Sequence, residues 1–183
     1  PLPSLLIDEL LPSTTVTLPK RLSKRVLPNQ LIERLNSDSD SPFNGIIKTQ
    51  TRHEGVISAG PFITALTGSI TNGALYEYRD PKTGDGDIEK ILPILKNYWG
   101  AVKDTFPKAW GQPSRKSRLM HGTGIRSMSV LMDEILAGYS NISKVTKLEF
   151  YNELQCIVPF CKWTGGTWKF SNGEIKKWNE IQN

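Results

Sequence analysis

Side chains able to do acid–base, redox or metal chemistry are few in this sequence and lie far apart. There are two histidines, His53 and His121, and two cysteines, Cys156 and Cys161. The spacing of the cysteines fits neither a C-x-x-C redox pair nor a zinc site, and there is no second pair to complete four ligands. We therefore expect both cysteines to be buried free thiols, which suits a reducing compartment.

His121 opens the run His121-Gly122-Thr123-Gly124, ahead of an apolar helical pattern. A phosphate could bind at such a point, because the first backbone N–H groups of a helix are free and its dipole favours an anion. The run lacks the spacing of a phosphate loop, however, and no Lys-Ser or Lys-Thr follows it. The plain start of a helix is the favoured interpretation. His53 lies in a predicted polar turn, where we expect it to be exposed.

The acidic stretch from Asp80 to Asp87 resembles a calcium loop only superficially. The position that supplies the bidentate glutamate in such loops is Ile91 here, so a solvated loop is favoured over an ion site. The sequence also has no G-x-S-x-G nucleophile elbow, no recognisable carboxylate pair and no cluster of metal ligands. We expect no catalytic residue, metal or cofactor, and the chain taken alone is not predicted to be an enzyme.

The basic residues indicate a possible binding partner more clearly than these isolated groups do. The net charge is +5, and clustered cations gain free energy on a phosphate backbone by releasing counterions. One patch comprises Lys20, Arg21, Lys24, Arg25 and Arg34, and a second comprises Lys108, Arg115, Lys116, Arg118 and Arg126. If the two patches converged they would form a phosphate-binding surface; the alternative is solvated loops on separate faces. The residues predicted to bind nucleic acid are Lys20, Arg21, Lys24, Arg25, Arg115, Lys116, Arg118 and Arg126.

The C-terminal tail mixes tryptophans with lysines. Aromatic side chains set among cations can stack on nucleic-acid bases. Tryptophans near a chain end more often anchor the tail on the core, and we favour that interpretation while keeping the first open. The residues concerned are Trp163, Trp168 and Trp178, with Lys162, Lys169, Lys176 and Lys177.

The chain that positions these residues has the composition of an ordinary globular protein. Of its 183 residues, 38% are hydrophobic and 22% charged, which favours one folded domain over a disordered chain. No apolar run approaches the roughly 18 residues of a membrane span, and no basic-then-apolar leader opens the chain. A cytoplasmic location is the expectation.

Apolar residues recur at helical spacing in several segments. The strongest pattern runs from Ile88 to Phe106, with a kink expected at Pro93. In a later helix we expect Leu148 to face inward, and we expect Trp110 to fold back onto the core. The other helices are expected at 3–12, from Gln30 with Asn29 as its cap, from Ser58 or Gly60 to Ile70, at 122–138 and at 147–158.

Two short β-prone segments, 45–51 and 55–58, flank a polar turn. This arrangement predicts that they pair as a hairpin. A short extended piece is expected at 75–78, and 13–27 is expected to be a loop or a marginal helix. The predicted fold class is therefore mainly α (α+β): a single helical domain over residues 1–183 with one small β-hairpin.

The order of several segments resembles that of DGQHR-domain proteins. The stretch Leu35–Ile47 (LNSDSDSPFNGII) is similar to the Ln-d-d-SPf-g-I segment of that family. The stretch Leu95–Val102 (LKNYWGAV), followed by Phe106-Pro107 and Trp110, is similar to its L-k-n-Y-f/w-x-A-v…FP…W pattern. The remaining similar segments are 57–66, 123–132 and the Trp-rich tail.

The motif that names the family, Asp-Gly-Gln-His-Arg, is not found in this sequence. In family members it lies upstream, in a ParB/sulfiredoxin-like half associated with nucleotide chemistry, so no catalytic residue is carried over to any position here. The resemblance implies the C-terminal helical portion of a larger protein, beginning after that half. The first residue, Pro1 rather than Met, also favours that expectation.

Two functions are expected from these features. The first is a non-catalytic helical accessory domain of a DGQHR-type protein linked to DNA modification or its regulation, with DNA as the partner of its basic loops. The alternative is a protein-interaction module that packs against its own N-terminal catalytic half, another subunit or a second copy. The apolar opening segment 3–12 is the basis of that alternative. No membrane partner is expected.

Overall fold

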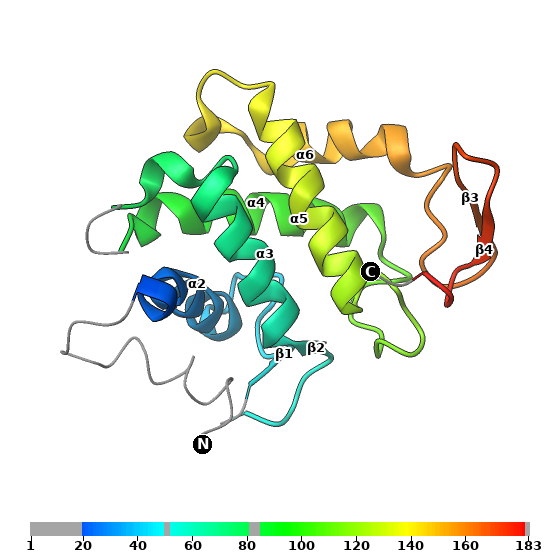
Figure 1. Cartoon of the computed structure of the whole chain (residues 1–183), viewed down its shortest axis with the longest axis horizontal. Coiled ribbons are helices and arrows are strands. Elements are labelled where there is room, and N and C mark those ends of the chain that lie inside the picture. The colour runs from blue at the N-terminus through cyan, green and yellow to red at the C-terminus, as the bar shows by residue number, and fades with distance from the viewer. Residues whose placement is uncertain (1–19, 50–51, 81–84, 182–183) are drawn as a thin grey trace.

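Helix α4 (Ile88–Thr105) is the centre of the fold, and it contains the apolar pattern that is clearest in the sequence. The computed structural model describes residues 20–49, 52–80 and 85–181. Helix α4 packs against α2 (Lys20–Ser37) and α6 (Lys147–Leu154), while α3 (Ala59–Asn72) packs against α2 and α5 (Gly122–Ala137). Figure 1 shows α3 and α5 crossing in front of α4. The mainly helical fold class is confirmed.

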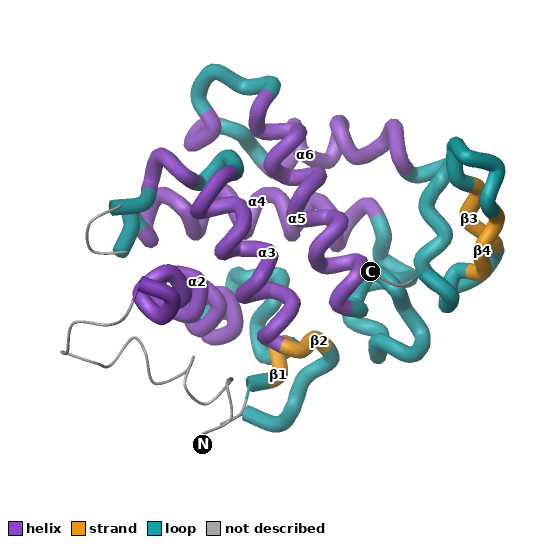
Figure 2. Tube along the Cα trace, viewed as in Figure 1, coloured by secondary structure: helices purple, strands orange, loops and turns teal. Residues whose placement is uncertain are grey.

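Short elements complete the architecture. Strands occur at two separate places in Figure 2, one pair beside the start of α3 and one pair in the C-terminal tail. The strands are β1 (Ile47–Lys48), β2 (Ile57–Ser58), β3 (Thr167–Lys169) and β4 (Ile175–Lys177), and the 3-10 helices are η2 (Tyr76–Tyr78), η3 (Ile142–Lys144) and η4 (Gln155–Ile157). The prediction of an extended segment at 75–78 is wrong. The backbone there makes a 3-10 turn, in which the Tyr78 N–H donates to the carbonyl of Leu75.

The predicted hairpin between 45–51 and 55–58 is wrong, because β1 and β2 run parallel. The chain loops out after Lys48 and returns in the same direction, and the N–H groups of Val56 and Ile57 both donate to the carbonyl of Ile46. Gly55 makes this close return possible. Its φ is +139°, and a Cβ there would lie 2.8 Å from the backbone nitrogen of Lys48. The structure's hairpin is β3–β4, which is antiparallel.

Helix α2 begins at Lys20 rather than at Gln30, so the predicted cap at Asn29 is also wrong. The Asn29 side chain instead donates to the carbonyl of Arg25 within the helix. Pro28 lies inside α2 and would normally break it. Burial prevails over that local preference, since Leu27, Leu31 and Leu35, spaced four residues apart, are fully buried.

The helices expected around α3, α4 and α5 are confirmed, and α4 continues through Pro93. Trp110 folds back as expected, since its ring contacts those of Phe43 and Trp99. Two expectations fail in and just after α6: Leu148 is exposed while Phe150 is buried, and Cys156 is exposed rather than buried. The segment expected to form a helix at 3–12 lies outside the described residues.

Helix α6 starts with a capping box, which yields a first test. The Thr146 hydroxyl accepts from the Glu149 N–H at 3.3 Å, and the Glu149 carboxylate accepts from the Thr146 N–H at 2.7 Å. Thr146→Ala should lower the free energy of unfolding by about 1 kcal/mol, measured by urea denaturation. Thr64→Ala, inside α3 and exposed, is the matched control and should cost nothing or stabilise slightly. Equal losses for both variants would contradict the assignment.

The same box gives stability a pH dependence. Hydrogen bonds from the Thr146 backbone and then its hydroxyl lower the pKa of Glu149 below its ordinary value. A carboxyl whose pKa is lower in the folded state stabilises the fold above its unfolded pKa, and that contribution is lost as pH falls through the folded pKa. Alanine keeps the backbone N–H, so the difference between wild type and Thr146→Ala should shrink in acid by the share of the hydroxyl bond alone.

Among the helices of residues 20–49, 52–80 and 85–181, none has an apolar stretch of the length that a membrane span needs.

Candidate nucleic-acid interface

The second basic patch lies in and around the segment that joins α4 to α5. Residues 105–132 contain five cations and no carboxylate. Lys108 is exposed just after α4, and Arg115 and Lys116 are exposed on a turn. The N–H of Lys116 donates to the carbonyl of Pro113 at 2.7 Å, which fixes that turn. These side chains therefore project from an ordered backbone.

Arg118 joins this segment to the C-terminal tail. Its backbone N–H donates to the carbonyl of Trp163 at 2.9 Å, and its guanidinium donates to the carbonyl of Asn179. The ring of Trp163 also packs edge-on against the ring of Phe106, the C-cap residue of α4. Arg118 therefore holds the tail in place, and its guanidinium is already engaged with the protein. The sequence gives no signal for this link, because the residues it joins are far apart in the chain.

His121 and Arg126 lie at the N-terminus of α5. His121 is the residue that caps the helix, and its Nδ1 accepts from the Thr123 N–H. Arg126 donates to the carbonyl of Gly122, one turn back. Partial burial, and then the charges of Arg118 and Arg126, lower the pKa of His121. A histidine made harder to protonate by two cations indicates positive potential around this helix end.

Buried donors gather where the two segments meet. The Ser117 hydroxyl, the Arg118 Nε–H and the Trp163 indole N–H are buried and have no hydrogen-bond partner within the part of the chain that the structure describes. An unpaired buried polar group costs free energy. These atoms are shielded from solvent, so a phosphate at the surface cannot reach them, and they are a cost within the fold rather than a part of the basic surface.

The excess of positive over negative charge in the sequence comes from this segment and the C-terminal tail. Residues 105–132 and 155–181 together contain nine cationic side chains and two carboxylates, whereas the rest of the sequence has fourteen and sixteen. Figure 1 shows both segments at the same end of the molecule. We call this region the cationic end; its basic residues are Lys108, Arg115, Lys116, Arg118, Arg126, Lys162, Lys169, Lys176 and Lys177.

The first basic patch does not belong to the cationic end. Its residues lie in α2, and Figure 1 places α2 and the 111–121 segment on opposite sides of α3. Arg25 is half-buried and already has an interaction partner. Arg34 is paired with Asp38 and Glu89, at 3.8 and 3.7 Å. The side chains of Lys20, Arg21 and Lys24 lie outside the described residues. Among the described side chains, only the second patch is gathered with further cations.

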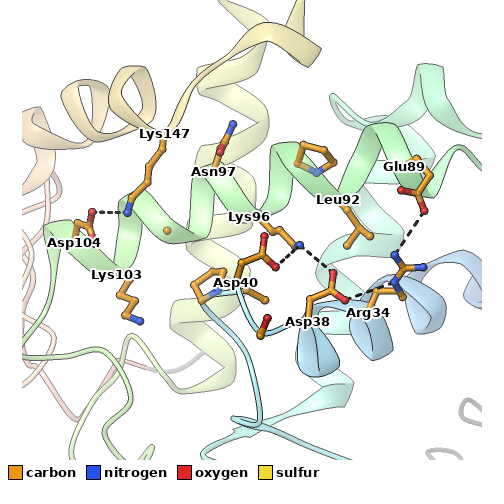
Figure 3. Close-up of a pocket in the computed structure, with 15 residues that line it drawn as sticks. Arg34, Asp38, Asp40, Glu89, Leu92, Lys96, Asn97, Lys103, Asp104 and Lys147 are labelled. Atoms are coloured by element: carbon orange, nitrogen blue, oxygen red, sulfur yellow. Dashed lines mark hydrogen bonds and ion pairs between the residues drawn. The ribbon is translucent and has the colours of Figure 1, made fainter.

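A groove of about 550 Å³ lies between α4 and the turn after α2. Figure 3 shows Lys96 between Asp38 and Asp40, with ion pairs of 2.9 and 2.8 Å, and Lys147 against Asp104 at 2.7 Å. Although partial burial opposes its charge, hydrogen bonds to Asp40 and Asp38 raise the pKa of Lys96. The cations and carboxylates that line the groove are equal in number, so it offers an anion little net attraction.

Carboxylates and thiols elsewhere serve the fold. Asp133 accepts hydrogen bonds from the Ser69 hydroxyl and the Ala74 N–H, which joins α5 to the end of α3; burial raises its pKa despite these bonds. Burial also raises the pKa of Cys161 to about 11, which leaves the thiol protonated and weakly nucleophilic. Over residues 20–49, 52–80 and 85–181, no group of three or more His, Cys, Asp or Glu residues could hold a metal ion.

Comparisons with protein-family models, with curated proteins and with solved structures find no match for this chain. The structure is mainly helical, and the two segments that give the sequence its net positive charge, 105–132 and 155–181, meet through Arg118.

Proposed function

We propose that this chain binds DNA through its cationic end. In this proposal it is a non-catalytic helical accessory domain, and the resemblance to DGQHR-type proteins connects it to DNA modification or its regulation. The observation that supports DNA binding best is the carboxylate-free segment 105–132, tied through Arg118 to a lysine-rich tail. Phosphate contacts from such a surface need no base-specific side chain, so the expected binding has little sequence preference.

Three side chains are best placed for this contact. Lys108, Arg115 and Lys116 are exposed, and none has an ion pair with another described residue. A cation already neutralised by a carboxylate releases fewer counterions on binding than one that is unpaired. These three residues should therefore contribute most to the dependence of affinity on salt.

Affinity for a short duplex, measured by fluorescence anisotropy over a series of salt concentrations, tests the proposal. Lys108→Gln/Arg115→Gln/Lys116→Gln should weaken binding at low salt about tenfold or more and make the log–log salt slope shallower by about 2 to 3. The control Lys48→Gln/Lys103→Gln/Lys144→Gln removes the same charge from exposed lysines outside the cationic end. Equal effects for the two triple variants, or no salt-dependent binding by wild type, would reject the proposal.

A protein-interaction module is the second candidate, and it would use exposed apolar side chains. Leu148 is 67% exposed and Val130 is 61% exposed, on α6 and α5. Large apolar side chains that face solvent are common at partner surfaces when they are contiguous. Concentration-dependent association that is abolished by Leu148→Ser, in the absence of DNA binding, would favour this candidate over the first.

A further inference from the structure

We propose that the cavity at the C-terminal ends of α3 and α5 binds an organic cation, a guanidinium or an alkylammonium group. The cavity has a volume of about 540 Å³, and the ends of both helices, η2 and the start of η3 contribute to its lining. Figure 1 shows these helix ends on the side of the molecule away from the β3–β4 tail. None of the lining residues belongs to the cationic end, so the site is independent of the proposed function.

The lining of this cavity is acidic. Glu77, Asp133 and Glu134 contribute carboxylates, and no lysine, arginine or histidine is among the described residues that line it. The negative potential extends further, since partial burial and then the charges of Glu153 and Glu149 raise the pKa of Tyr139, another lining residue. In a chain with a net charge of +5 this is a local reversal of sign, and it attracts cations.

The ends of two helices add to that potential. Helix α3 ends at Asn72 and α5 ends at Ala137, and both residues line the cavity. The C-terminal end of a helix carries a partial negative charge, which a basic residue in the last turn often compensates. Neither α3 nor α5 has a basic residue in its last turn. A cation in the cavity supplies the compensation that these two helix sequences do not.

Asp133 offers one of its oxygens to such a ligand. The hydrogen bonds from the Ser69 hydroxyl and the Ala74 N–H are both accepted by Oδ1, which fixes the carboxylate in one orientation. Oδ2 accepts no hydrogen bond from a described residue and lies beside Gly73, which also lines the cavity. A Cβ at position 73 would collide with Oδ2. The glycine therefore leaves this oxygen uncovered.

The rest of the lining suits an organic cation. Tyr76 and Tyr139 line the cavity, and Tyr76 is 52% exposed. The face of a tyrosine ring attracts a guanidinium or ammonium group through its quadrupole. Leu136 and Ile142 are buried and form an apolar wall, against which the methylene stem of such a ligand can lie.

A metal ion fits the cavity less well than an organic cation does. No group of three or more His, Cys, Asp or Glu residues in the described part of the chain could hold a metal ion, and these carboxylates are no exception. A hydrated metal ion would also gain nothing from the rings and the apolar wall. The geometry thus selects a cation that has a carbon stem.

Agmatine, which carries a guanidinium and an ammonium group, is the probe that tests the site. Titrated into the ¹⁵N-labelled chain, it should shift the amide signals of Ala74 and Tyr139 saturably, while uncharged n-butylurea should not. Glu77→Gln/Glu134→Gln should weaken agmatine binding about tenfold or more. Both glutamates are exposed, so the fold should persist. Tyr76→Ala should weaken binding about two- to fivefold, and Tyr76→Phe should retain it.

The matched control is Glu54→Gln/Glu174→Gln, which removes the same charge from exposed carboxylates outside the cavity and should leave agmatine binding unchanged. Absence of saturable agmatine binding by wild type would overturn the inference. Equal weakening by the two double variants would overturn it as well. Neither result bears on DNA binding, which the salt dependence of duplex affinity decides separately.

Sedimentation at low salt distinguishes two sources of the cation. A basic side chain of a second copy would make wild type self-associate, and excess agmatine or Glu77→Gln/Glu134→Gln would restore the monomer. A chain that binds agmatine and stays monomeric would instead have a free organic cation as its ligand. Both results support the site, because the chemistry that is bound is the same.

Discussion

Trp99→Ala is expected to lower the free energy of unfolding by about 3–5 kcal/mol. Trp99 is fully buried in α4, and its ring meets four others: Phe43 at 5.2 Å, Tyr98 at 5.3 Å, Phe62 at 5.5 Å and Trp110 at 6.2 Å. Alanine would remove the largest of the fully buried side chains and leave a cavity that these neighbours cannot fill without moving.

The cavity would open between segments that this ring cluster joins. Phe43 belongs to the turn after α2, Phe62 to α3 and Trp110 to the segment that leads into the basic turn. Loss of the central ring should therefore loosen the connection between the helices and the cationic end. Urea denaturation gives the stability, and near-ultraviolet circular dichroism reports the packing of the remaining rings.

Two controls separate packing from the loss of an aromatic group as such. Phe160→Ala removes a ring that is 72% exposed and should cost little. Trp99→Phe should cost less than Trp99→Ala, because the phenyl ring fills most of the cavity that alanine would leave; both variants remove the buried indole N–H, which has no partner among the described residues. Similar losses for Trp99→Ala and Phe160→Ala would contradict the central role of this ring.

Helices could be predicted well from the sequence where their apolar faces are long. The spacing of Ile88, Ile91, Leu95 and Trp99 predicts α4 despite Pro93, and the structure has that helix. Helix α2 was predicted too short, because Pro28 and a basic stretch hide an apolar face that only burial completes. Local preference is a weak guide where tertiary packing offsets it.

Pairing between segments was harder to predict than the segments themselves. The β1 and β2 segments were found from their composition, but their parallel direction depends on the route of the chain around Gly55. A short polar turn favours a hairpin in general, and nothing in the spacing reveals the tight return against Ile46.

The basic residues of the candidate site could be predicted from the sequence, but the contacts that join them to the tail could not. The basic stretch with Arg115, Lys116 and Arg118 can be found by counting charges. Its union with the tail depends on contacts of Arg118 with Trp163 and Asn179, which sequence spacing does not encode.

Gly124→Ala is expected to destabilise the protein by about 3 kcal/mol or more, at or beyond the upper end of what overpacking costs. Gly124 lies in the first turn of α5, against the backbone of the basic segment. A Cβ there would lie 2.6 Å from the Leu119 Cα and would collide with the carbonyl of Arg118. Backbone atoms cannot rotate away as a side-chain end can, and Leu119 is itself fully buried. The clash therefore exceeds the gain of about 1 kcal/mol that alanine gives over glycine within a helix.

The same variant separates stability from binding, because the segment it displaces holds the exposed cations Arg115 and Lys116. Gly124→Ala should weaken duplex binding even at temperatures where the helices remain folded by circular dichroism. Gly68→Ala is the matched control: Gly68 lies within α3, is exposed, and has no atom within 4 Å of a Cβ built there. That variant should stabilise the fold by up to about 1 kcal/mol and leave DNA binding unchanged. The run His121-Gly122-Thr123-Gly124 would then owe its glycine at 124 to the close approach of two backbones, and a Gly124→Ala variant as stable as wild type would refute that account.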